Sequence, residues 1–217
     1  MKKAILVFAV LILAAVVEAQ AQEISAVMYV NATAGLRVRS SPDLDGERIA
    51  SLSYMSEVRV TRQGENTVTI DGISGKWVYV TAGDTEGWVF DGYLITPENL
   101  KQMFVGEWED GPYGYAHVFH EDGTWGSGIG GIAFYQTGFW DIKRGVLVIE
   151  CNQLSYYDIG DDGEGYTKYT DFDFTYTPKF EFTDADTLSF YWDMVAVGRI
   201  STLSGIFTFH KMNSGGN

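Results

Sequence analysis

The runs Lys76-Trp77-Val78-Tyr79-Val80-Thr81 and Gly87-Trp88-Val89-Phe90 decide the fold class of the first part of the chain. In the first run two valines alternate with a tyrosine and a threonine, and this period of two puts the valines on one face of a β-strand. Between the runs stand Gly83 and Asp84, which are residues typical of turns. The sequence therefore predicts two short strands joined by a turn.

The same pattern extends toward the N-terminus. Further short runs, rich in β-favouring residues and bounded by Gly, Asp, Asn or Ser, also read as strands. These predicted strands are Ala26–Val30, Leu36–Arg39, Arg48–Leu52, Glu57–Arg62 and Thr67–Ile70. Strands this short and regular favour a small closed barrel, which we assign to residues 22–95.

Four motifs in this region carry a family resemblance. Leu36–Pro42 (LRVRSSP) resembles the "L-N-V-R-S-G-P" signature of bacterial SH3-like domains, and Glu47–Leu52 is similar to their "I-G-x-L" strand. Lys76–Val80 resembles their "W-x-x-V" strand, and Asp84–Leu94 their terminal "G-x-x-G-W-V-x-x-x-Y-L". The resemblance implies an SH3-like barrel that binds a cell-wall peptide or a protein partner rather than a catalytic domain.

The chain departs from that family pattern at three places. Arg37 stands for the usual Asn, Ser41 stands for the usual Gly, and Thr61–Ser74 adds an extra strand-like excursion. Trp77 and Trp88 are expected to pack in or at the rim of the barrel rather than to serve as ligand platforms, because a small core needs aromatic volume.

Composition limits the classes of partner. The chain has 217 residues, with 15 Lys+Arg against 29 Asp+Glu, and a formal net charge of −14. Phosphate backbones and anionic lipid surfaces attract clustered cations, so this balance argues against binding to nucleic acid or to an anionic membrane. Residues 22–95 hold 6 bases and 10 acids, net −4, whereas residues 96–217 hold 7 bases and 18 acids, net −11. All five arginines of the first domain lie between Arg37 and Arg62, so an anionic partner would meet that domain.

Residues 1–21 have the pattern of a secretory signal peptide. Met1–Lys3 gives a positive start, Ala4–Val17 is an apolar run shorter than the ~20 residues that span a bilayer, and Ala19–Ala21 supplies small residues for cleavage. We predict cleavage after Ala21 and export to the periplasm or beyond the cell. The alternative is a retained N-terminal anchor.

Residues 96–104 predict a short helical linker. Thr96–Glu98 supplies a capping hydroxyl, a proline for the first helical position and an acid for the first turn. Leu100, Met103 and Phe104 then fall on one helical face and can enter a neighbouring core.

Residues 105–217 read as a second, larger all-β domain. The ten predicted strands are Gly106–Glu109, Tyr115–His120, Thr124–Gly126, Ile132–Gln136, Phe139–Lys143, Val146–Cys151, Tyr169–Tyr176, Lys179–Thr183, Thr187–Asp193 and Gly205–Lys211. That number is enough for an up-and-down antiparallel β-barrel.

This domain resembles the lipocalin-like (calycin) domains of exported bacterial proteins. Val105–Trp108 is similar to their "G-x-W" opening strand, and Val118–Trp125 to their "F-x-x-D-G-T-Y" hairpin. Gly138–Leu147 resembles "G-x-W-x-h-x-G-x-L", with h an apolar residue, and Gly205–Lys211 resembles the closing strand. A β-sandwich and an incomplete barrel are the alternative architectures.

The aromatic residues of this domain are the candidate ligand site. Trp125, Trp140 and Trp192 would line a hollow barrel and bind a small apolar ligand, or they would fill a closed one. The filled interior is favoured, since large side chains suffice to fill a barrel of this size.

No catalytic residue, metal ligand or cofactor is predicted. His117 and His120, three apart on one strand, point to opposite faces and cannot chelate together. The acidic stretch Asp158–Glu164 reads as a solvated turn, with calcium binding as its alternative. Cys151 reads as a buried structural thiol, because no base is near it in the sequence.

The sequence thus predicts an exported, non-catalytic binding or interaction protein of the bacterial cell envelope. Its SH3-like domain would contact a cell-wall component or an envelope protein, and its barrel would be a scaffold or a holder of a small apolar ligand. The alternative is an envelope hydrolase with a carboxylate-based site in the second domain.

Overall fold

The computed structural model describes residues 25–111, 114–129, 134–193 and 204–212, so the predicted signal peptide lies outside the described residues. The chain divides into two compact units, one holding Arg37–Ser51 and Val58–Gly92 and the other holding the chain from Tyr93 onward. Met28–Leu36 and Leu52–Glu57 group with the second unit. Among the described residues no helix is long and apolar enough to cross a membrane.

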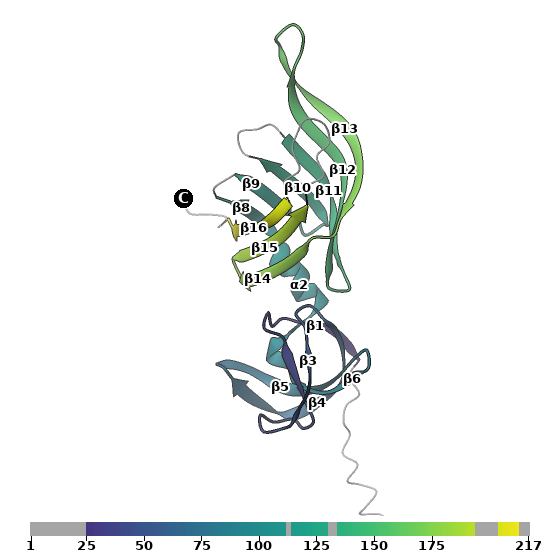
Figure 1. Ribbon diagram of the computed structural model, residues 1–217, viewed down its shortest axis with the longest axis vertical. Coiled ribbons are helices and arrows are strands. Elements are labelled where there is room, and N and C mark those ends of the chain that lie inside the picture. Colours follow the sequence, from purple (N-terminus) through teal and green to yellow (C-terminus); the bar gives the residue numbers. More distant parts are fainter. Residues whose placement is uncertain (1–24, 112–113, 130–133, 194–203, 213–217) are drawn as a thin grey trace, which may run out of the picture. The chain divides into compact units, whose positions relative to one another are not determined.

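The first sheet has seven strands in the order β3-β2-β6-β5-β4-β1-β7 (Figure 1). The strands are β1 (Ala26–Val30), β2 (Leu36–Arg39), β3 (Arg48–Leu52), β4 (Glu57–Ile70), β5 (Ile73–Ala82), β6 (Thr85–Phe90) and β7 (Leu94–Ile95). A short 3-10 helix, η1 (Asp91–Tyr93), separates the last two.

Valines make up much of the buried part of the first sheet. Seven of them are at most 3% exposed: Val30, Val38, Val58, Val60, Val78, Val80 and Val89. In β2 and in the first part of β4 the valines alternate with exposed or half-buried residues, as the period of two predicts. The separate strands expected at Glu57–Arg62 and Thr67–Ile70 are wrong, because both belong to one continuous β4. An irregularity in its pairing with β5, between Gln63 and Thr67, accommodates the turn-like residues between the two predicted strands.

A short helix, α2 (Pro97–Phe104), follows the first sheet. The Thr96 hydroxyl accepts a hydrogen bond from the Asn99 backbone N–H at 3.2 Å, so the predicted cap is confirmed. Leu100 and Phe104 are fully buried on one face of the helix.

The second sheet has nine antiparallel strands in the order β13-β12-β11-β10-β9-β8-β16-β15-β14. The strands are β8 (Gly106–Asp110), β9 (Tyr115–Phe119), β10 (Thr124–Ile129), β11 (Phe134–Lys143), β12 (Val146–Ile159), β13 (Gly165–Tyr176), β14 (Lys179–Asp184), β15 (Thr187–Asp193) and β16 (Ser204–Lys211).

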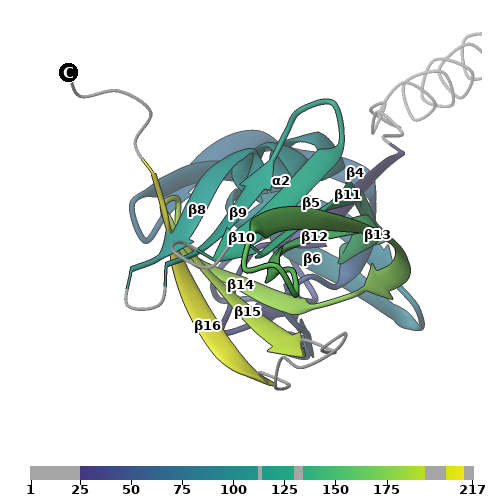
Figure 2. The same cartoon turned by 90° about the horizontal axis from the view of Figure 1, so that it is seen from above.

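This second sheet is an up-and-down meander that curls (Figure 2). Its first and last strands in sequence, β8 and β16, pair through Trp108 and Lys211. Its two free edges are β13 and β14, which follow each other in the chain through Thr177-Pro178. Proline has no N–H to donate, which fits the interruption of the ladder there. The predicted all-β class is confirmed.

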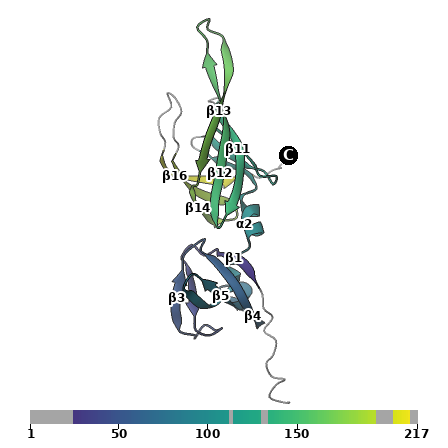
Figure 3. The same cartoon turned by 90° about the vertical axis from the view of Figure 1, so that its right-hand side faces the viewer.

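Several strand boundaries differ from those predicted. The strands expected at Ile132–Gln136 and Phe139–Lys143 are wrong as separate elements, since β11 runs from Phe134 to Lys143 with an irregularity after Thr137. Residues 132–133 of the first expected strand lie outside the described residues. The β12–β13 hairpin is also longer than expected, reaching Ile159 and resuming at Gly165, so it projects beyond its neighbours in the sheet (Figures 1 and 3).

Candidate binding site

Four side chains form a transverse row on the outer face of the first sheet. Arg62 of β4 pairs with Tyr79 of β5, Tyr79 pairs with Trp88 of β6, and Trp88 pairs with Arg39 of β2. Directly opposed residues of antiparallel strands share a face. We call Arg62, Tyr79, Trp88 and Arg39 the arginine–aromatic row; all four lie in the first compact unit.

A β-bulge places Arg62 in this row. Val60 pairs with Val80, but the next registered pair is Arg62 with Tyr79, so Thr61 is the extra residue. The Thr61 hydroxyl donates a hydrogen bond to the Tyr79 carbonyl at 3.3 Å. If β4 continued here without a bulge, Arg62 would face the valine interior, because residues two apart on a regular strand, such as Val60 and Arg62, share a face.

The row is held together by cation–π and aromatic contacts. The Arg62 guanidinium carbon lies 3.9 Å from the centroid of the Tyr79 ring and 5.6 Å from that of Trp88. The Tyr79 and Trp88 rings meet edge to face, with centroids 5.5 Å apart. Such contacts orient the guanidinium and leave its N–H groups available to a ligand.

At the other end of the row, Arg39 also fixes a loop. Its Nη1 donates to the Gly46 carbonyl at 2.7 Å, and the Ser40 N–H donates to the Glu47 carbonyl at 3.0 Å. Within the described ranges the ion pairs all involve lysines, so neither Arg39 nor Arg62 is neutralised by a carboxylate.

Gly87 allows Trp88 to approach β2. Its φ of 154° and its burial leave no room for a side chain, since a Cβ there would lie 2.6 Å from Val38 Cγ1 and 2.9 Å from the Arg39 carbonyl oxygen. This close approach is the physical reason for the Gly-Trp pair in the sequence. It fixes the position of Trp88 in the row.

Further charged residues lie around the arginine–aromatic row. Arg37 is exposed between two buried β2 residues and therefore shares the outward face of Arg39. Arg59, also exposed, pairs with Thr81 and donates to the Ser25 hydroxyl at 3.2 Å. Glu86, opposite Thr81, is an acid at the margin of this surface. The arrangement can hold a carboxylate by its guanidiniums while the rings contact an apolar group beside it.

Sequence reasoning missed most of this site. Trp77 is 7% exposed and packs against Phe90, as expected, but Trp88 lies half-buried on the outer face. The alternation of β5 could have placed Tyr79 outward. Arg62 could not be placed, because alternation alone does not reveal a bulge.

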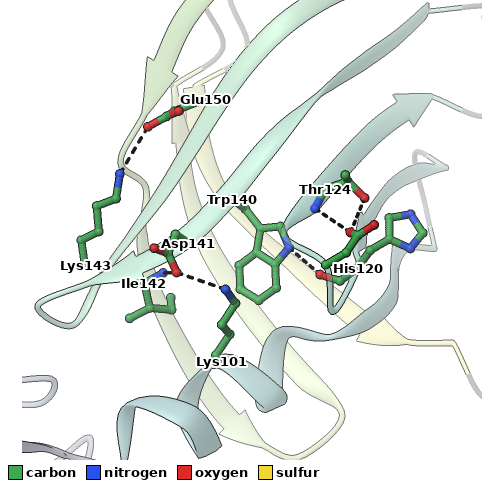
Figure 4. Close-up of polar contacts among 9 residues, drawn as sticks. Lys101, His120, Thr124, Trp140, Asp141, Ile142, Lys143 and Glu150 are labelled. Atoms are coloured by element: carbon green, nitrogen blue, oxygen red, sulfur yellow. Dashed lines mark hydrogen bonds and ion pairs between the residues drawn. The ribbon is translucent and has the colours of Figure 1, made fainter.

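The predicted tryptophans of the second sheet lie in different surroundings. Trp125 and Trp140 are 2% and 3% exposed, and Trp140 donates its indole N–H to the His120 carbonyl at 2.9 Å (Figure 4). They join one aromatic cluster through His117 and Phe119. The backbone of Trp192 belongs to β15, but its side chain lies outside the described residues. A ligand role for these tryptophans stays a prediction.

The α2 helix fills one end of the curled sheet. Phe104, its last residue, contacts five aromatic rings, those of Phe119, Trp140, Phe180, Phe182 and Phe190. Its carbonyl accepts the Trp108 indole N–H at 2.7 Å. On the rim, Lys101 of α2 pairs with Asp141 of β11 at 3.2 Å (Figure 4).

Burial shifts the pKa values of two titratable groups in this sheet toward their uncharged forms. Burial lowers the pKa of His117 to about 3, so the imidazole is neutral at physiological pH. Cys151 is buried, as expected, and burial raises the pKa of its thiol to about 11. Gln136 donates to the Tyr176 hydroxyl at 3.2 Å.

Within the described ranges no three His, Cys, Asp or Glu side chains converge as metal ligands. The acidic stretch Asp158–Glu164 has calcium binding as its predicted alternative role. In it, Asp158 forms an ion pair with Lys168 at 2.5 Å, and the Asp162 side chain accepts a hydrogen bond from the Glu164 N–H at 3.0 Å. These two carboxylates therefore serve the hairpin itself.

Comparison with known proteins finds a family match in the first domain. Residues 34–95 match the bacterial SH3 domain family, in agreement with the resemblance of the first domain. No curated protein and no solved structure matches the chain. The matched range contains every member of the arginine–aromatic row.

Proposed function

We propose that the protein is an exported, non-catalytic binding protein of the bacterial cell envelope, and that its SH3-like domain holds a cell-wall peptide or a protein partner through the arginine–aromatic row. The match of residues 34–95 to the bacterial SH3 domain supports a cell-wall-binding module. The single observation that carries the assignment to this surface is the alignment of Arg62, Tyr79, Trp88 and Arg39 across four neighbouring strands.

The chemistry of the row suits a ligand that bears a carboxylate. A guanidinium can donate two parallel hydrogen bonds to a carboxylate, and a cation already oriented on Tyr79 loses little side-chain freedom on binding. A neighbouring apolar group of the ligand would contact the exposed part of Trp88. In a chain of net charge −14, this cluster of cations is the surface to which an anionic group is steered.

The second domain is proposed to be a lipocalin-like barrel that serves as a scaffold. The meander topology and the pairing of β8 with β16 support this architecture. The packing of Phe104 against the inner aromatic residues supports a filled end, so a small apolar ligand would have to enter elsewhere. Export rests on the leader predicted at residues 1–21.

A binding role is favoured over a carboxylate-based hydrolase by the burial pattern. Glycosidase chemistry needs two facing carboxyl groups. Among the described residues, the buried polar or charged side chains are Asp110, His117 and Gln136, which include a single acid.

Co-sedimentation of the mature chain with purified peptidoglycan tests this proposal. We expect the wild type to sediment with the polymer and the Arg62→Ala/Tyr79→Ala variant to lose at least about fivefold of its binding, since a hydrogen bond to a charged group contributes ~1.5–3 kcal/mol. Lys143→Ala, which also removes one exposed cation, is the control and should bind as the wild type does. Unchanged binding of the double variant would reject the row as the site.

A further inference from the structure

Three tyrosines are exposed together on the outer face of β11, β12 and β13. Tyr135, Tyr157 and Tyr169 are 54%, 55% and 68% exposed, and Ile159, on the same strand as Tyr157, is 65% exposed. We call these four residues the tyrosine platform. Large apolar surfaces left open to water in a soluble protein commonly mark a binding site.

The strand register puts the platform on one face. Tyr135 pairs with Ser155, and Ser155 pairs with Tyr169, so the two tyrosines share a row across three strands. Tyr157 and Ile159 follow Ser155 at intervals of two along β12 and therefore face the same way. Leu154, which directly precedes Ser155, is 2% exposed and points to the interior, so the platform faces outward.

Among the described residues, the outer part of the hairpin is a two-stranded ribbon, and Figure 3 shows it extending beyond the neighbouring strands. The last registered pair of β11 with β12 in the described ranges is Phe134 with Tyr156, whereas β12 and β13 are paired as far as Ile159 and Gly165. An isolated two-stranded ribbon is only marginally stable in water. A ribbon that exposes tyrosines in this way is better explained as a binding surface than as a means of stabilising the fold.

Contacts on the other face hold the ribbon in place. Lys168 forms its ion pair with Asp158, and its Nζ lies 5.4 Å from the centroid of the Tyr166 ring and 5.9 Å from that of Tyr156. On the platform face, the Tyr157 side chain packs over Gly165, where a Cβ would collide with it. The Tyr157 ring therefore lies close against the ribbon.

The groups among the rings are polar and largely uncharged. Platform tyrosines alternate with Ser155 and Thr167, and the next row across the strands is Thr137, Gln153 and Asp171, all exposed. No lysine or arginine belongs to these rows, so nothing there would attract a phosphate or a carboxylate. The surroundings are acidic, since residues 96–217 have a net charge of −11.

An uncharged polysaccharide has the complementary chemistry. A pyranose ring presents C–H groups that pack on an aromatic face, and hydroxyls at its edge that bond to Ser, Thr, Gln and Asp side chains. Tyr135 and Tyr169 are two strands apart, roughly 10 Å at the backbone, a span that suits several linked sugars rather than one. A helical protein partner would need a continuous aliphatic stripe, and the platform offers only Ile159.

We propose that the tyrosine platform binds a glycan strand of uncharged pyranose sugars, as a site separate from the arginine–aromatic row. The contact residues are Tyr135, Tyr157 and Tyr169, with Gln153 and Asp171 as hydrogen-bonding neighbours. Together with the SH3-like domain, the platform gives the chain one site for the anionic part of a cell-wall polymer and another for its sugars.

Isothermal titration calorimetry of the mature chain tests this site, with soluble six-sugar oligomers of N-acetylglucosamine and of glucose as probes. We expect the wild type to bind at least one of them and the Tyr157→Ala/Tyr169→Ala variant to bind at least about tenfold more weakly, because the variant loses the two aromatic faces on which the C–H groups of the sugars would pack. Tyr157→Phe/Tyr169→Phe keeps the rings and should lose less than about threefold.

Two controls separate the outcomes. Tyr191→Ala removes an exposed tyrosine of β15 and should bind as the wild type does. Arg62→Ala/Tyr79→Ala should also retain oligosaccharide binding, so failure of the proposed peptide site leaves this test intact. The inference is overturned if neither probe binds at millimolar concentration, if the alanine variant binds unchanged, or if the platform cross-links to a protein partner and to no glycan.

Discussion

The two sheets differ in where they place their tryptophans and in what fills their interiors. The seven-stranded sheet keeps valines inside and places Tyr79 and Trp88 on its outer face beside arginines. The nine-stranded sheet places Trp108, Trp125 and Trp140 inside, at most 3% exposed. A small barrel closes over β-branched residues, whereas a larger one needs aromatic volume to exclude voids. Tyr79 and Trp88 are therefore available for binding, whereas Trp77 and Phe90 of the first sheet and the three tryptophans of the second stabilise the fold.

The largest expected effect comes from the interior of the second sheet. Phe104→Ala should destabilise that unit by about 3–5 kcal/mol, because it leaves a cavity among five aromatic rings. The matched change in the first sheet, Tyr79→Ala, should cost less than about 1 kcal/mol of folding stability, because that ring is on the surface. Hydrogen exchange of the buried strands measures each unit separately. Equal losses in the two variants would contradict the comparison.

A smaller effect is expected from pH. The folded pKa of His117, about 3, is below its ordinary value of 6.5, so the unfolded chain binds more protons between these values. The free energy of unfolding therefore contains a contribution from neutral His117 that is complete above pH 6.5. It decreases as the pH falls, by about 2 kcal/mol at pH 5. Denaturant unfolding at pH 7.5 and pH 5 measures it, with His117→Gln as the control that should lose this dependence. A wild type equally stable at both values would show that His117 titrates normally.

The sequence predicted the fold where one local rule decides the structure. Thr96 and Pro97 located the start of α2, and alternating valines located the strands of the first sheet. The prediction failed where an extra residue or a pairing between distant segments determines the structure. The bulge at Thr61 turns Arg62 outward, and no alternation pattern contains that information.

The same limit explains the prediction errors in the second sheet. Gly160–Glu164 carries strong turn signals, but both strands beside it were predicted too short, since residues exposed on both faces of a ribbon show no apolar alternation. Trp125 and Trp140 were predicted as ligand residues from composition alone. Their burial depends on Phe119 and His117 of a neighbouring strand.

The most direct test of the central claim compares two forms of one soluble cell-wall peptide, with its carboxylates free or amidated. If the arginine–aromatic row recognises carboxylates, amidation should weaken binding to the mature chain at least about tenfold. Arg62→Lys should weaken binding of the free form severalfold although it keeps the charge, because lysine cannot donate two parallel hydrogen bonds. Equal affinity for the two peptides would contradict the account.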